Sequence, residues 1–248
     1  MLWGNFGAVH LTSLALAAGI ITGLYFILRN RSEKTQRITL FILSLSGIAA
    51  IIFNLVRWGS PIEYLPFHMC SITAMLLPPA ILIKSRAMSN LLLVWLLGAV
   101  FALVLNNQQA NYEILSDTFV FYFFPHMFEV GIPILMFRLK LWKKELRAIP
   151  TTLALTVGIY TVVHFINLLL NHIVKVKGLV DAYGDPIFLN YMYSIKPVVP
   201  FMELFWSIIP YQYFYLLFAI PIIAVYLGIV YLPEIIALIR KKRQSKTA

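Results

Sequence analysis

Two short segments of the sequence combine ionisable side chains with long apolar runs. The first, Glu63–Pro79, reads EYLPFHMCSITAMLLPP and holds His68 and the chain's single cysteine, Cys70. The second, FPHMFEVG, holds His126 and Glu129. An imidazole can act as a general base and a thiol as a nucleophile. These residues could therefore support acid–base or covalent catalysis.

Their spacing limits which pairs can act together. His126 and Glu129, three apart, share a face of an ideal helix, so the carboxylate could fix the tautomer of the imidazole. His68 and Cys70, two apart, point to opposite faces and form no dyad unless Pro66 unwinds this turn. Cys70 could instead meet a histidine from another helix, or be a small buried hydrophobic residue.

A metal site is a further option. His10, His68 and His126 could form a three-histidine zinc site with an open position, but no HExxH spacing supports it. The sequence has no P-loop, GxSxG or strand-associated GxGxxG motif, so it favours neither nucleotide nor serine-hydrolase chemistry, and we expect no cofactor. A single cysteine excludes an internal disulfide and a Cys-rich metal site.

The composition is typical of a membrane protein. Of the 248 residues, 60% are hydrophobic and 12% charged, with a mean hydropathy of +0.83. A soluble domain carries about twice that charged fraction. Several apolar runs reach the roughly 20 residues that cross a bilayer as a helix. We therefore expect an all-α polytopic membrane protein with one integral domain, whose first helix is retained because no basic n-region precedes it.

The apolar runs predict seven transmembrane helices. Their expected ranges are 6–28, 38–56, 67–83, 89–105, 119–137, 149–171 and 213–239, with an outer connection over 172–212. Pro78 and Pro79 should kink or end the third helix. With the N-terminus outside and the C-terminus inside, the inner segments hold 16 of the 20 Lys and Arg residues, as the positive-inside rule requires. The expected partners are therefore membrane lipids and not nucleic acid.

Counting along these helices, at about 1.5 Å per residue, places most polar side chains near the outer membrane face. They are His10, Arg57, His68, Cys70, Asn107, His126, His164 and Asn167. Lipid does not solvate such groups, so they should face one another or a water-filled cavity. Alternatively, they form interhelical hydrogen bonds worth about 0.6–2 kcal/mol each.

Several motifs, in the same order along most of the chain, resemble the YwaF-type family of bacterial integral membrane proteins. They are AVHLTSLAL, LPFHMCSITAMLLP, FYFFPHMFEVG, FINLLL, LNYMYSIKP and IPYQYF. The resemblance implies seven helices and a bacterial plasma membrane. It also singles out His10, His68, Cys70, His126, Asn190, Tyr191, Lys196 and Pro197.

That family is similar to a eukaryotic group of multipass enzymes that move or hydrolyse lipid acyl chains with a Cys or Thr nucleophile and a histidine. In the acyltransferase branch the cysteine directly precedes the histidine of the third helix. Here Phe67 holds that position and Cys70 follows His68. The connection over 171–189 is also longer and more charged than the bacterial pattern.

The leading hypothesis is an enzyme that acts on a lipid or lipid-linked substrate by acyl transfer or hydrolysis. His126 or His68 would be the general base and Cys70 a nucleophile, with His10 and Glu129 beside them. The candidate substrate-binding residues are Arg57, Asn107, Asn167, Asn190, Tyr191 and Lys196, whose ammonium could bind a phosphate. The alternatives are a non-enzymatic lipid- or small-molecule-binding protein, a transporter, and a membrane scaffold of a partner complex.

Overall fold

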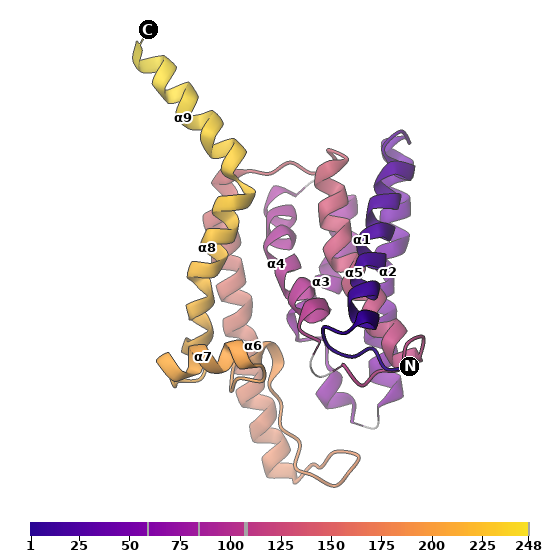
Figure 1. The fold of residues 1–248 in the computed structure, drawn as a ribbon. Helices are drawn as coiled ribbons and strands as arrows, with labels where there is room; N and C mark the ends of the chain where they lie inside the picture. The colour runs from indigo at the N-terminus through magenta and orange to yellow at the C-terminus, as the bar shows by residue number, and fades with distance from the viewer. Residues whose placement is uncertain (59, 84, 107–108, 248) are drawn as a thin grey trace.

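The computed structural model describes residues 1–58, 60–83, 85–106 and 109–247, with the backbone alone for 241–243 and 245–247. These residues form the helices α1 (Ala8–Leu28), α2 (Glu33–Arg57), α3 (Met69–Leu82), α4 (Arg86–Val104), α5 (Asp117–Arg138), α6 (Ile149–Lys177), α7 (Pro200–Ile208), α8 (Ala219–Val230) and α9 (Leu232–Thr247) (Figure 1). Short 3-10 turns lie at Pro61–Tyr64, Leu146–Ala148, Tyr191–Tyr193 and Phe214–Phe218. The described part of the chain has isolated bridges but no strand, which confirms the all-α prediction.

Five of the described helices, α1, α2, α4, α5 and α6, are long and apolar enough to cross a membrane. A sixth candidate span is the pair Phe214–Val230 and Leu232–Arg240, which is bent by 63°. Helix α3 has 14 residues, so it covers roughly 21 Å at about 1.5 Å per residue, less than the roughly 30 Å of a bilayer core. The chain is thus a multipass helical membrane protein, while seven crossings and the N-out orientation stay predictions.

Two of the expected ranges end in different places. Helix α6 continues past 171 to Lys177, because Gly178, at φ +59°, provides the left-handed C-cap that stops it. The single helix expected over 213–239 is instead a 3-10 turn followed by α8 and α9. Pro233 lies at the start of α9. Because proline has no backbone N–H, it would leave a gap in the hydrogen-bond pattern of one continuous helix. At the bend, the buried Tyr231 hydroxyl donates to the Asn90 side-chain oxygen.

Helix α3 ends soon after its proline pair, close to the expected residue 83, and a kink at the prolines stays a prediction. Pro78 and Pro79 lie inside the helix, which continues to Leu82. The two prolines remove two backbone donors from the helical hydrogen-bond pattern. Pro78 is among the buried residues of the helix.

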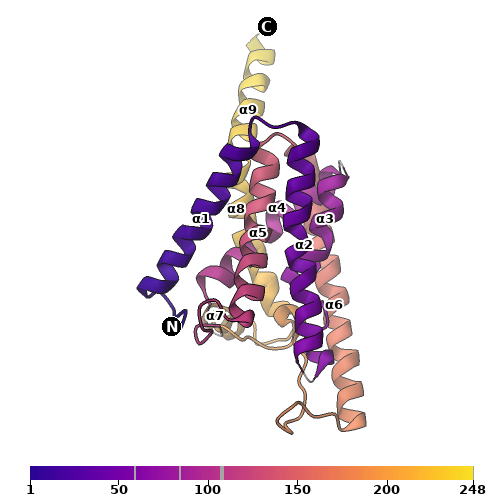
Figure 2. The same cartoon turned by 90° about the vertical axis from the view of Figure 1, so that its right-hand side faces the viewer.

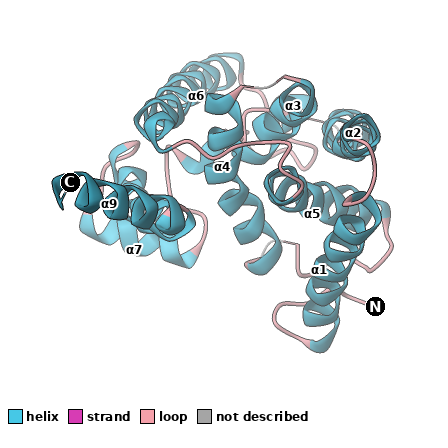
Figure 3. Ribbon diagram, turned by 90° about the horizontal axis from the view of Figure 1, so that it is seen from above, coloured by secondary structure: helices cyan, strands magenta, loops and turns pink. Residues whose placement is uncertain are grey.

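Helix α4 lies in the middle of the bundle and packs on α3, α5 and α6 (Figure 3). Helix α2 packs on α3 and α5, whereas α1 contacts α5 at the edge of the bundle and tilts away from α2 (Figure 2). Helix α7 lies across the start of α8 (Figure 1). The burial of α4 and α5 agrees with their central position, since 56% and 61% of their most apolar 18-residue windows are buried, against 17–22% in α1, α2 and α6.

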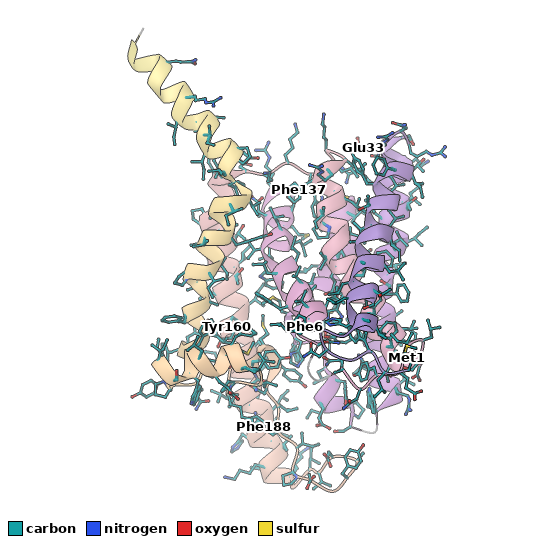
Figure 4. All side chains as sticks on the ribbon, viewed as in Figure 1. Met1, Phe6, Glu33, Phe137, Tyr160 and Phe188 are labelled. Atoms are coloured by element: carbon teal, nitrogen blue, oxygen red, sulfur yellow. The ribbon has the colours of Figure 1, made fainter. Side chains whose placement is uncertain are left out.

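The two ends of the bundle differ in charge. The basic segments after α1, α3 and α5, together with α9, lie at the end marked by Glu33 and Phe137, and Met1, Phe6 and Phe188 lie toward the opposite end (Figure 4). At the basic end Arg86 pairs with Glu145 at 2.7 Å and Lys144 with Glu234 at 2.8 Å. The starts of α3 and α5 and the Tyr191–Tyr193 turn lie at the opposite end, where the sequence placed its polar cluster.

Candidate active site

A cavity of about 620 Å³ lies within the bundle at the end opposite the basic segments. Among the described helices, α2 to α8 all contribute to its wall, and α1 and α9 do not. The wall formed by α4, α7 and α8 is apolar, with Phe101, Phe205, Ile220 and Ile223. Helices α3 and α5 and the turns around Glu63 and Tyr193 contribute the polar side chains Glu63, His68, Cys70, Tyr122, His126, Glu129 and Tyr193. The cavity is therefore amphipathic.

His68 and Cys70 line the same cavity because the chain is not helical at His68. Pro66 precedes an extended stretch, and His68 is the N-cap of α3 at φ −73°, ψ 154°. The helical rule that places residues two apart on opposite faces therefore does not apply to His68 and Cys70. The turn after Pro66 is unwound, which is the condition under which the sequence allowed these two side chains to lie together. Non-helical backbone at membrane depth is tolerated where it lines a cavity, and here it supplies His68.

The hydrogen bonds of His68 fix its tautomer. Its Nδ1 accepts the Met192 backbone N–H at 3.4 Å, so the proton of the neutral ring lies on Nε2. The rings of Tyr191 and Tyr193 lie against it, each at 5.4 Å between centroids. His68 thus offers a hydrogen-bond donor to the cavity.

His126 has the opposite tautomer. Its Nδ1 donates to the Tyr122 carbonyl, one turn earlier in α5, at 2.6 Å, which leaves Nε2 as an acceptor. The Tyr122 ring lies against the imidazole at 4.3 Å between centroids, and its hydroxyl donates to the Ala102 carbonyl at 2.9 Å. A backbone carbonyl, and not the Glu129 carboxylate, therefore holds the ring in this tautomer. The lone pair on Nε2 can accept a proton, which a general base must do.

Glu129 lies one turn further along α5 and is almost completely buried, at 3% exposed. Its Oε2 has no hydrogen-bond partner among the described residues. The carboxyl is close enough to the Cys70 thiol for the two groups to interact electrostatically. Cys70 is a free cysteine in the cavity wall. The cavity therefore combines a thiol, a basic imidazole nitrogen, an imidazole donor and an unpaired carboxyl.

Tyrosines form part of the site that the sequence reasoning missed. Burial raises the pKa of Tyr193 to about 12, and the nearby Cys70 adds to the rise. Burial, followed by the charge of Glu63, raises the pKa of Tyr64, and burial also raises that of Tyr112. All three line the cavity as neutral hydroxyls near neutral pH. Tyr122 could have been found, because it precedes His126 by one helical turn.

His10 lies outside the cavity, on α1. It is fully buried, its Nε2 donates to the Leu103 carbonyl at 2.8 Å, and its Nδ1 accepts the Phe6 N–H at 2.9 Å. The Nε2 hydrogen bond thus joins α1 to α4, and the Nδ1 hydrogen bond holds the segment that precedes α1. In the part of the chain that the structure describes, no three His, Cys, Asp or Glu side chains are grouped to hold a metal ion, so His10 does not complete a three-histidine zinc site.

The polar residues of the outer connection mostly hold that connection together. Asn167 is fully buried, donates to the Tyr191 carbonyl and accepts the Tyr191 N–H, at 2.8 and 2.9 Å. The Tyr191 hydroxyl donates to the Ile62 carbonyl. Asn190 accepts the Ile195 N–H at 3.0 Å and donates to the Lys196 carbonyl at 2.9 Å. None of Asn167, Asn190 and Tyr191 lines the cavity, so each positions the loop that supplies Met192 and Tyr193.

Two further substrate-binding candidates, Lys196 and Arg57, are also outside the cavity wall. Lys196 is exposed, with its Nζ 4.3 Å from the centre of the Phe188 ring. Arg57 pairs with Asp117 at 3.8 Å, and both side chains are about half exposed. Such exposed pairs contribute about 0–1 kcal/mol. Asn107 lies outside the described residues.

The fold and the cavity define a class: a multipass helical membrane protein with an amphipathic internal site. The chain matches the family model of the TMEM164 family over residues 5–231, which is most of its length. It therefore belongs to the TMEM164 family. No match was found among curated proteins or among solved structures.

Proposed function

We propose that this protein is a membrane enzyme that acts on a lipid or lipid-linked substrate by acyl transfer or hydrolysis. The observation that supports it best is the unprotonated Nε2 of His126 in the wall of a cavity that also holds the thiol of Cys70. The apolar wall suits an acyl chain, and the polar wall suits an ester group. As the YwaF-type resemblance implies, the proposal includes a bacterial plasma membrane and membrane lipids as partners.

In the proposed reaction, His126 Nε2 takes the proton of Cys70 as the sulfur attacks the ester carbonyl carbon. The His68 Nε2–H donates to the carbonyl oxygen as it gains negative charge. The C–O bond then breaks, the leaving alkoxide takes the proton from His126, and a thioester remains on Cys70. A hydroxyl of a second lipid, or water, attacks the thioester with His126 again accepting a proton, which returns the free thiol.

The test uses the full-length protein in phosphatidylethanolamine–phosphatidylglycerol vesicles, with released fatty acid and new acylated products measured by mass spectrometry. General base catalysis contributes about 10²–10⁴-fold, so His126→Ala should lose that much activity, and Cys70→Ala should lose acyl transfer. His172, exposed on α6, provides the matched control, since His172→Ala should behave as wild type.

Each outcome separates the proposal from its alternatives. Full activity of Cys70→Ser with loss in His126→Ala would replace the thioester by direct attack of water or hydroxyl. Normal membrane abundance with no turnover of any lipid would favour a binding protein or a transporter. Loss of abundance in both variants would favour a packing role and a scaffold.

A further inference from the structure

Among the described residues, the cavity wall holds carboxyl groups and neither lysine nor arginine. These carboxyl groups belong to Glu63 and Glu129. The His68 Nδ1 accepts a hydrogen bond, which a protonated ring could not do. A chain whose formal net charge is +10 thus keeps its cations away from this cavity. Such a wall is complementary to a cationic ligand group.

Glu129 is the residue that most needs a partner. It is 3% exposed, and its Oε2 is buried without a hydrogen bond from the described residues. The neighbouring helices offer small apolar residues at this point: a Cβ built on Gly47 of α2 would lie 2.6 Å from the Ala74 Cβ of α3 and 3.9 Å from Glu129 Oε1. Leaving a carboxyl unpaired at membrane depth is costly, so such groups are characteristically paired or functional.

Aromatic side chains surround the same space. Trp58 and Tyr64 stack at 5.7 Å between ring centroids, and both line the cavity together with Tyr122 and Tyr193. The faces of aromatic rings attract ammonium groups, most strongly where water is excluded. Carboxyl and aromatic groups together therefore match a positively charged amine better than a neutral or anionic group.

We infer that the cavity binds an amphiphile with an ammonium head group, that Glu129 is its counter-ion, and that the apolar chain lies along α4, α7 and α8. This inference rests on the proposed function, since it names the substrate class of the same site. The head group lies at the polar wall, where the ester of a lipid would be within reach of Cys70 and His126.

Cys70 provides the reporter, because it is the chain's single cysteine and lines the cavity. The full-length protein in dodecyl maltoside is treated with N-ethylmaleimide, and alkylation is followed by intact mass. Dodecylamine, dodecanol and dodecanoate are added as probes that share one chain and differ in head group. Dodecylamine should slow alkylation at concentrations at least tenfold below those at which dodecanol or dodecanoate do.

The variant Glu129→Gln keeps the shape of the side chain and removes its charge. It should bring the protection by dodecylamine to the level of dodecanol, whereas Glu203→Gln, at an exposed position on α7, should leave it unchanged. Equal protection by all three probes, or unaltered protection in Glu129→Gln, would overturn the inference.

Two further comparisons keep the result decisive. If Glu129→Gln does not fold, the three-probe comparison on the wild-type protein decides alone. If Cys70 does not react, the same probes are compared by thermal unfolding, where only dodecylamine should raise the unfolding temperature. None of these measurements needs turnover. Protection by dodecylamine without lipid turnover would support the ligand class and refute the proposed enzyme activity. Lipid turnover without protection by dodecylamine would support the enzyme activity and refute the ligand class.

Discussion

Gly47 allows α2 and α3 to approach beside Glu129, and Gly47→Ala tests how far this contact determines the site. The added Cβ would lie 2.6 Å from the Ala74 Cβ and 3.3 Å from its Cα. Ordinary contact begins at 3.4 Å, so the two helices must separate by at least 3.4 − 2.6 = 0.8 Å. Ala74 has no flexible side chain that could absorb this displacement.

The magnitude follows from two opposing effects. Overpacking of this kind costs about 1–3 kcal/mol, and replacing glycine by alanine within a helix gains about 0.5–1 kcal/mol. We expect a net loss of about 1–2 kcal/mol in the free energy of unfolding. Cys70 precedes Ala74 by one turn of α3, so it moves with the helix. A displacement of about 1 Å can lower catalysis about 10²-fold.

Gly98 on α4 is the matched control. A Cβ there would lie 2.8 Å from the Met69 sulfur, at the end of a flexible side chain that can move aside. Gly98→Ala should therefore be neutral or slightly stabilising. Unfolding by dodecyl sulfate in mixed micelles measures the free energy of unfolding of both variants. Lipid turnover measures how far each substitution impairs the proposed active site. If Gly47→Ala is as stable as Gly98→Ala, the close contact of α2 and α3 is not what the structure indicates.

Three other predictions test the remaining polar residues. His10→Ala should lower the free energy of unfolding by about 1–3 kcal/mol because the buried Leu103 carbonyl loses its donor; thermal unfolding at the wild-type temperature would contradict this role. Asn167→Ala releases the Tyr191 backbone, so the outer connection should be cleaved faster in limited proteolysis, and an unchanged rate would refute its function as a clamp. The folded protein holds the Tyr193 proton up to about pH 12, whereas the unfolded chain releases it near 10.0. Stability should therefore fall as pH rises through this interval, less steeply in Tyr193→Phe, and parallel unfolding curves would show that the group is not shielded.

Hydropathy and charge counting predicted the class of protein and the depth of its polar residues. Apolar runs of helical length gave the spans because lipid leaves a crossing backbone no other partner. The grouping of basic segments at one end of the bundle matches the distribution from which the orientation was inferred. Counting residues along each span was enough to gather His10, His68 and His126 toward the other end.

What counting could not give is the direction in which each side chain points. In a water-soluble helix, polar and apolar faces reveal the orientation, but a membrane helix is apolar toward both lipid and protein, so its sequence carries little such signal. His10 and His126 therefore looked equivalent. Packing separated them, because α1 lies on the outside of α5 and uses His10 to bind the α4 backbone.

The sequence by itself determined that a helical membrane protein would hold ionisable groups near one face, because the cost of burying them restricts where they can lie. The tertiary structure alone decided which of them share a cavity. His68 and Cys70 meet there because the backbone before α3 is extended and not helical. His126 Nε2 is an acceptor because the Nδ1–H of the ring donates to the Tyr122 carbonyl and not to Glu129. Both facts depend on contacts between or within helices that no spacing rule encodes.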